Sequence, residues 1–195
     1  IEVSVEGFYR QLDNLVVAGS GNSGVGRAFG METLLRYKPD ARFFGFIAYT
    51  LSRSTRRPTP DQSERFFQFD QTHILTALGS YRLGRGWEFG ARYRLVSGSM
   101  NTPQTYGFYD LNVGSYLPLN SYPPNSERNP LFHQLDVRVD KTWEYGWGKL
   151  GVYLDVLNVY NQGNPEGVSY NYNSTLSTRA TGLPILPSLG IRGEL

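Results

Sequence analysis

The last residues of the sequence, Leu183-Pro-Ile-Leu-Pro-Ser-Leu-Gly-Ile-Arg-Gly-Glu-Leu195, carry the clearest indication of the fold class. Apolar and polar or small residues alternate along it: Ile185, Leu189, Ile191 and Leu195 against Ser188, Gly190, Arg192 and Glu194. A period of two predicts a strand with one apolar and one polar face. A terminal amphipathic strand is typical of a bacterial outer-membrane barrel, in which the last strand pairs with the first.

Composition favours the same class over an ordinary soluble domain. Aromatic residues make up 14% of the 195 residues, with 14 Tyr and 11 Phe, while the mean hydropathy is only −0.39. A transmembrane barrel has this balance because only every second strand residue meets lipid. No apolar run approaches the ~18 residues of a membrane helix. The net charge of +2 gives no indication of nucleic-acid binding.

Alternating hydrophobicity predicts about eight strands, each long enough to cross a bilayer at a tilt. They cover roughly 1–11, 25–38, 41–53, 69–83, 86–97, 131–143, 148–161 and 183–195.

The connections between these strands alternate in length. Short turns are expected at 39–40, 83–86 and 144–148, and long loops at 12–24, 54–68, 98–130 and 161–182. Transmembrane barrels have short periplasmic turns and long extracellular loops. We therefore expect both chain ends on the periplasmic side.

The two faces of the expected strands differ in chemistry. The polar face would line a hydrated lumen, with cross-strand ion pairs. Its predicted charged residues are Glu32, Arg36, Arg92, Arg94, Asp136, Arg138, Asp140 and Asp155. Strand 41–53 is less regular, because Phe44 and Phe46 fall on this inner face. The apolar face ends in aromatic residues near the short turns, as expected of an interfacial girdle. These are Tyr37, Tyr81, Trp87, Trp143, Tyr145 and Trp147.

A series of short motifs runs through the chain in a fixed order. They are Gly26-Arg-Ala-Phe-Gly-Met-Glu32, Phe69-Asp-Gln-Thr-His73, Leu83-Gly-Arg-Gly-Trp-Glu-Phe-Gly90, Leu135-Asp-Val-Arg-Val-Asp-Lys141, Leu157-Asn-Val-Tyr-Asn161 and the terminal stretch. In this order and spacing they resemble the C-terminal part of TonB-dependent outer-membrane receptors.

The resemblance implies a location in the bacterial outer membrane and uptake of a scarce nutrient such as a siderophore, cobalamin or carbohydrate. Barrels of this family have about 22 strands and a plugged lumen, so we expect residues 1–195 to be the C-terminal segment of the barrel, without the plug. The implied partners are the remaining strands and plug of the receptor, TonB through the missing N-terminal part, the bilayer with its lipopolysaccharide, and other outer-membrane proteins. The alternative is structural: a free-standing eight-stranded barrel, or a wall segment in a multi-chain complex.

Two loop regions are candidate ligand or partner surfaces. The first is the basic cluster Arg53, Arg56, Arg57 and Arg65, which could attract an anionic ligand or lipopolysaccharide phosphates, or simply be solvated. The second is the aromatic loop 98–130, in which exposed rings could bind a ligand or pack on one another. Its aromatic residues are Tyr106, Phe108, Tyr109, Tyr116 and Tyr122.

Nothing in the sequence predicts an enzyme, a metal site or a cofactor. His73 and His133 are the only histidines and there is no cysteine. A metal site needs three or four converging ligands, and a catalytic site needs a nucleophile, a base and an orienting group together. We interpret both histidines as polar strand-end residues.

Overall fold

The computed structural model describes residues 1–195 except 18, 20 and 120–121. In the described part of the chain the fold is all-β, every strand pairing is antiparallel, and no helix occurs. Among these residues there is accordingly no helix with the length and apolar character to cross a membrane.

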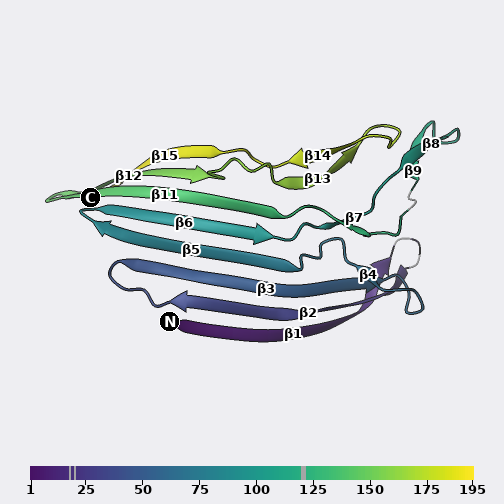
Figure 1. Ribbon diagram of the computed structural model, residues 1–195, viewed down its shortest axis with the longest axis horizontal. Coiled ribbons are helices and arrows are strands. Elements are labelled where there is room, and N and C mark those ends of the chain that lie inside the picture. Colours follow the sequence, from purple (N-terminus) through teal and green to yellow (C-terminus); the bar gives the residue numbers. More distant parts are fainter. Residues whose placement is uncertain (18, 20, 120–121) are drawn as a thin grey trace.

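One nine-stranded sheet makes up most of the molecule (Figure 1). Its strands, in spatial order, are β1 (Glu2–Val17), β2 (Gly21–Tyr37), β3 (Phe43–Arg57), β5 (His73–Gly84), β6 (Trp87–Val96), β11 (Phe132–Tyr145), β12 (Gly148–Leu157) and β15 (Leu186–Glu194), with the short β4 (Arg65–Phe66) beside β3. All eight predicted strands are therefore present, and neighbours in sequence are neighbours in the sheet.

The sheet is open. β1 and β15 lie at its two edges, and no pairing joins them among the described residues. The closure that a free-standing eight-stranded barrel requires is thus not formed in this chain. Both chain ends lie at the same end of the sheet as the short turns (Figure 1).

The predicted long loops contain more structure than expected. The loop predicted at 12–24 is wrong, because β1 continues to Val17 and β2 begins at Gly21. Asn14 has a φ of 56° where the register of the two strands shifts, so the predicted loop is a bulged extension of the hairpin. The loop predicted at 54–68 begins only after Arg57 and contains β4.

The other two long loops form hairpins. Region 98–130 contains β7 (Met100–Asn101), β8 (Tyr106–Asp110), β9 (Ser115–Leu119) and β10 (Glu127–Arg128), and region 161–182 contains β13 (Pro165–Tyr170) and β14 (Ser177–Thr181). β8 pairs with β9, β7 with β10, and β13 with β14. These hairpins extend from the end of the sheet opposite the short turns (Figure 1).

Strand register separates the residues into two chemically different faces. One row across β2, β3, β5, β6 and β11 consists of Arg36, Phe46, Leu78, Arg92 and Asp136. The next row, on the opposite face, consists of Leu35, Ile47, Ala77, Tyr93 and Leu135. We call these the polar face and the apolar face. The irregularity predicted for strand 41–53 is present, because Phe46 lies on the polar face, opposite Arg36.

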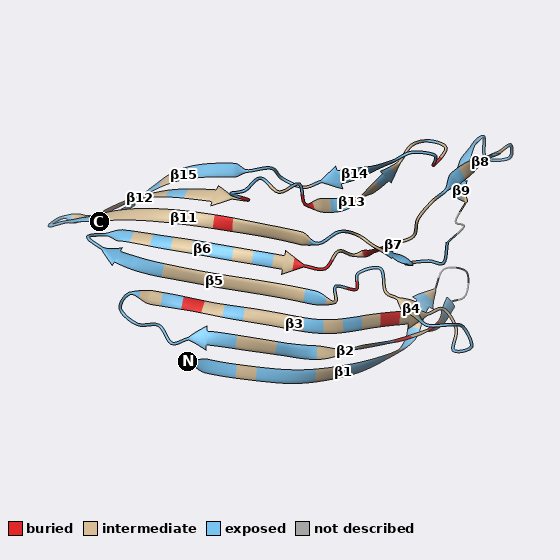
Figure 2. Cartoon of the chain, in the orientation of Figure 1, coloured by how far each residue is buried: buried red, intermediate tan, exposed pale blue. Residues whose placement is uncertain are grey.

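The sheet forms a single layer rather than half of a sandwich. Val96 and Met100, exposed 7% and 9%, are the buried apolar residues of the described chain, whereas its other buried residues are mostly polar (Figure 2). Within the described residues, the strands of the main sheet make their extensive contacts with their neighbours in the same sheet. A soluble domain of this size would bury many large apolar side chains, so the apolar face requires a cover from outside the described chain.

Candidate functional site

The polar face has a buried carboxylate at its centre. Asp136 is 6% exposed and accepts hydrogen bonds from Arg92 on the next strand, with Nε at 3.0 Å and Nη2 at 2.6 Å. Its other oxygen accepts from Gln134 Nε2 at 2.6 Å and from the backbone N–H of Asn158 at 3.0 Å. Each carboxylate oxygen therefore accepts two hydrogen bonds, and the group holds β6, β11 and the end of β12 together.

A second ion-pair group lies beside the first on the same face. Arg138 donates to both carboxylate oxygens of Asp140, at 2.8 and 2.9 Å, and approaches Asp155 at 3.7 Å. Its guanidinium also lies 4.0 Å from the ring centroid of Tyr153. A cleft of about 340 Å³ is lined by residues of both groups and by Glu88. Charges of both signs thus form a cross-strand network, which is the pattern predicted for this face.

The remaining predicted polar-face residues follow from the register. Glu32 pairs with Thr50 and Arg36 with Phe46, both on the polar face of β3. Arg94 lies opposite Thr76 and Gln134, and its guanidinium is 5.2 Å from the Phe132 ring. The structure therefore places all eight predicted charged residues on one face of the sheet. They are Glu32, Arg36, Arg92, Arg94, Asp136, Arg138, Asp140 and Asp155.

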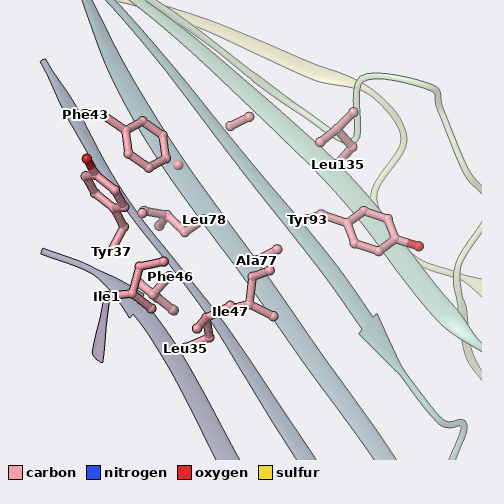
Figure 3. Close-up of a pocket in the computed structure, with 13 residues that line it drawn as sticks. Ile1, Leu35, Tyr37, Phe43, Phe46, Ile47, Ala77, Leu78, Tyr93 and Leu135 are labelled. Atoms are coloured by element: carbon pink, nitrogen blue, oxygen red, sulfur yellow. The ribbon is translucent and has the colours of Figure 1, made fainter. Parts of the chain in front are cut away.

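The apolar face carries a belt of constant depth. On β3 it runs from Phe43 to Leu51 and on β6 from Trp87 to Leu95, each about nine residues, close to the ~9–11 of a tilted transmembrane strand. A groove of about 440 Å³ crosses this belt (Figure 3). Its floor is low because small residues meet there: Gly45, Ala77, Gly79 and Ala91.

Aromatic residues border the belt at the short-turn end. Tyr37, Tyr81, Trp87 and Trp143 lie on the apolar face near the short turns, and all four side chains are exposed. Lys141 lies between two of them, 5.2 Å from the Trp87 ring and 5.4 Å from the Trp143 ring. Beyond the belt, Tyr145 and Trp147 stack on each other with centroids 5.4 Å apart.

The nearby turn at 38–42 is fixed by one carboxylate. Asp40 accepts backbone N–H groups of Arg42 at 2.8 Å and Phe43 at 2.6 Å. These two hydrogen bonds lower the pKa of Asp40 because they favour its charged form, and the bond from the Phe43 N–H has the larger effect. The Tyr37 hydroxyl also donates to Asp40, at 3.1 Å, which connects the aromatic border to the turn.

The predicted basic cluster is divided between the two faces. Arg53 and Arg57 alternate onto the apolar face, whereas Arg56 and Arg65 lie opposite each other on the polar face. Arg53 stacks on Phe66, 4.7 Å from its centroid.

Each of the other three arginines bonds within its own segment. Arg56 donates to Ser54 Oγ, Arg57 to the carbonyl of Pro60 and Arg65 to Gln62. The four do not converge on one point.

The predicted aromatic residues are only partly brought together. Tyr109 and Tyr116 meet edge to face at 5.3 Å on the β8–β9 hairpin, and Tyr116 meets Tyr172 of the other hairpin at 5.4 Å. Sequence reasoning missed Tyr172. The structure does not join Tyr106, Phe108 or Tyr122 to this ring cluster, and all three are largely exposed.

A buried ion pair at the loop end was missed in the sequence. Asp70 is 1% exposed and pairs with Arg128 Nη2 at 2.6 Å, while its other oxygen accepts the backbone N–H of Ser54 at 2.6 Å. Arg128 also donates to the carbonyls of Asp70 and Gly98 and to the Thr72 hydroxyl. Four segments that are distant in sequence are thereby tied together.

Three asparagines form a second missed group, where β12 ends. Asn158, 1% exposed, donates to the carbonyls of Gln162 and Leu183, and Asn161 Oδ1 accepts the N–H of Ile185. Asn164 Oδ1 accepts the N–H of His133. The motif Leu157-Asn-Val-Tyr-Asn161 was noted for its resemblance; its positive φ values at Asn158 and Asn161 mark it as a turn that positions β15.

Both histidines contact tyrosine hydroxyls at the end of the apolar face nearest the long loops. Tyr49 Oη lies 2.8 Å from His73 Nδ1, and Tyr160 Oη lies 2.9 Å from His133 Nδ1. Within the described residues no three His, Cys, Asp or Glu side chains gather as potential metal ligands.

Comparison with protein-family models, curated proteins and solved structures finds no match to the chain.

Proposed function

We propose that this chain forms part of the wall of a TonB-dependent outer-membrane transporter, with the apolar face toward lipid and the polar face toward the lumen. The hairpins of regions 98–130 and 161–182 would then lie outside the cell, where they meet the nutrient, and the polar face would meet a plug or water. The other partners are the remaining barrel strands, TonB through the plug-bearing part, and lipopolysaccharide.

The uncovered belt on the apolar face is the observation that carries the proposal. Its depth of about nine residues suits a bilayer, and its short-turn border of Tyr and Trp suits the membrane–water interface. The opposite face combines ion pairs with small residues, as a hydrated interior requires. Water would solvate this apolar face poorly, whereas lipid covers it without any further layer of protein.

A structural wall segment in a multi-chain outer-membrane complex is the second candidate. The free edges at β1 and β15 favour it equally well, because strands from other chains could complete the sheet. The two candidates differ in whether removal of the protein abolishes a TonB-dependent activity.

Cysteine labelling tests the orientation of the faces, since the chain has no cysteine of its own. Thr76→Cys and Ala77→Cys form a matched pair, because these small neighbours on β5 lie on the polar and the apolar face. In isolated outer membranes we expect a charged maleimide to label Thr76→Cys and a lipid-soluble maleimide to label Ala77→Cys. Equal labelling of both variants by the charged reagent would refute a lipid-facing belt.

A second pair tests sidedness, and an uptake assay tests transport. Thr178→Cys on β14 should react with a charged maleimide on intact cells, and Arg85→Cys in the turn before β6 should react only after the outer membrane is permeabilised.

Cells that lack the protein should lose the TonB-dependent uptake of one nutrient. Unchanged TonB-dependent uptake together with a leaky envelope would instead establish the structural alternative.

A further inference from the structure

A pocket of about 390 Å³ lies at the loop end of the sheet, where β4 pairs with the end of β3 (Figure 1). The tip of the β1–β2 hairpin, the segment that follows β3 and the turn at 124–125 contribute to its walls. Its volume is within the range of small-molecule sites, roughly 300–1,000 Å³. Most of the wall is apolar, and this part consists of Leu15, Val16, Val17, Phe66, Phe67 and Pro124.

Three arginines of the basic cluster line the same pocket. They are Arg56, Arg57 and Arg65, all half-buried, whereas the fourth member, Arg53, does not line it. Among the residues that the structure describes, no carboxylate lines this pocket. The three guanidinium groups donate only to neutral acceptors, which are two backbone carbonyls, a hydroxyl and a side-chain amide.

Two of these arginines lie directly opposite each other. Arg56 of β3 pairs with Arg65 of β4, which puts their Cβ atoms roughly 4.5–5.5 Å apart. Like charges in this position destabilise a sheet. The Arg56 guanidinium also lies 4.5 Å from the ring centroid of Phe67, and burial lowers the pKa of Arg56 because it disfavours the charged form. An anion placed between the two guanidinium groups would relieve both costs.

The neighbouring acids do not supply this anion. Glu64 pairs with Arg27 and Asp70 pairs with Arg128, each at 2.6 Å. Glu64 also interacts electrostatically with Arg57, so the charge of Arg57 is partly balanced. The positive charge that the described residues leave unbalanced in the pocket is therefore that of the opposed pair.

We infer that this pocket binds a small organic carboxylate with a compact apolar body. The carboxylate lies between Arg56 and Arg65, because guanidinium groups bind a carboxylate through paired N–H donors. The body packs against the phenylalanine and proline side chains of the wall. The pocket lies beyond the belt, so binding does not depend on what covers the apolar face. Only the step from a bound ligand to a transported nutrient rests on the proposed function.

The two parts of the pocket distinguish this ligand from simpler ones. A neutral sugar would leave the opposed guanidinium groups without a counter-charge. Free phosphate or acetate would balance the charge but leave the apolar wall in contact with water. A ligand that carries both an anionic group and an apolar body satisfies both parts.

Isothermal titration calorimetry of the purified protein in matched detergent tests this inference. The probe is naphthalene-2-carboxylate, and the comparison compounds are its neutral amide, acetate and inorganic phosphate. We expect the carboxylate to bind and each of the other three to bind roughly tenfold or more weakly. The amide tests the charge, and the two small anions test the apolar body.

Variants locate the binding. Arg56→Gln/Arg65→Gln should weaken binding of the probe roughly tenfold or more, whereas Arg85→Gln/Arg179→Gln, which removes the same charge from an exposed turn and an exposed hairpin, should stay within about twofold. Arg56→Lys/Arg65→Lys keeps the charge and should recover part of the affinity. Val16→Trp should fill the pocket and compete with the probe, and Val16 is 84% exposed, so the larger ring displaces no packed neighbour.

Any of four results would overturn the inference. They are absence of probe binding to the unmodified protein, equal affinity for the amide or for a small anion, unchanged binding by Arg56→Gln/Arg65→Gln, and an equal loss in the control variant. Thermal melts followed by circular dichroism establish that each variant is folded. The Thr76 and Ala77 labelling pair reports on the membrane assignment separately, so failure of the pocket and failure of the proposed function give different results.

Discussion

Replacing Arg128 by Ala should release the loops around Asp70 while leaving the main sheet intact. In the structure Arg128 supplies the only cation that pairs with Asp70 among the described residues, and Asp70 is 1% exposed. Removing one member of a buried ion pair costs about 3–5 kcal/mol, because the other charge stays buried without a partner. Asp70 would keep its bonds from the Ser54 N–H and the Thr72 hydroxyl, and Arg128 is itself partly exposed. We therefore expect the lower end of this range, about 3 kcal/mol.

Amide hydrogen exchange measures this loss where it occurs. The Ser54 N–H bonds directly to Asp70, and the Met100 N–H bonds to the carbonyl of Gln68 in the same loop region. A local loss of about 3 kcal/mol corresponds to roughly a hundredfold faster exchange at these amides. Amides of β11 should be unaffected, because within the described residues the Arg128 side chain bonds to Asp70, Gly98 and Thr72 and not to that strand.

Two further variants separate charge from geometry. Arg128→Lys keeps the charge but cannot donate to the Asp70 carboxylate and the Gly98 carbonyl as a planar fork, so about half of the effect should remain. Asp70→Asn combined with Arg128→Met removes both charges, and its effect should be smaller than the sum of the single effects. Unchanged exchange at Ser54 and Met100 in Arg128→Ala would refute the assignment of this pair as the loop clamp.

Three other substitutions test separate parts of the structure. Asn158→Ala removes three part-buried side-chain hydrogen bonds beyond β12 and should lower the free energy of unfolding by about 2–3 kcal/mol in denaturant titrations, with Asn158→Asp as the partial rescue. The low pKa of Asp40 stabilises the folded state above the ordinary aspartate pKa, and that contribution is lost as the pH falls through the lowered value; Asp40→Asn should remove this acid sensitivity in melting curves. Gly30→Val should destabilise the sheet by about 1–3 kcal/mol, because a Cβ there would collide with the backbone oxygen of Leu51, whereas Gly193→Ala, with open space around it, should be tolerated.

The faces of the strands could be predicted because the period of two depends only on local sequence. The prediction extended even to Phe46, which breaks the hydrophobic pattern yet lies on the polar face as expected. The cross-strand partner of each residue could not be predicted in the same way. That Arg92 meets Asp136 depends on register, and register is set by turn geometry as well as by pattern.

The hairpins in the long loops could have been found in part. Asp110 accepts the N–H of Asn112 and its carbonyl accepts the N–H of Gly114, whose φ is +68°, so the sequence Asp-Leu-Asn-Val-Gly carries a recognisable turn. The contact between Tyr116 and Tyr172 could not be predicted from the sequence, because it joins two loops whose relative position depends on the whole fold. The pair Asp70 and Arg128 is separated by 58 residues, and a single sequence gives no reason to couple them.

The open edges of the sheet need further strands once the apolar face is assigned to lipid. Each edge strand has backbone N–H and C=O groups without sheet partners, and in hydrocarbon each such group costs several kcal/mol. Exposed apolar side chains, Val3 and Val5 on β1 and Leu189 and Ile191 on β15, continue the apolar face up to both edges. A membrane-embedded sheet with this pattern therefore needs further strands against β1 and against β15. A larger barrel of which this chain is one sector supplies these strands. In the structural alternative, other chains must supply them.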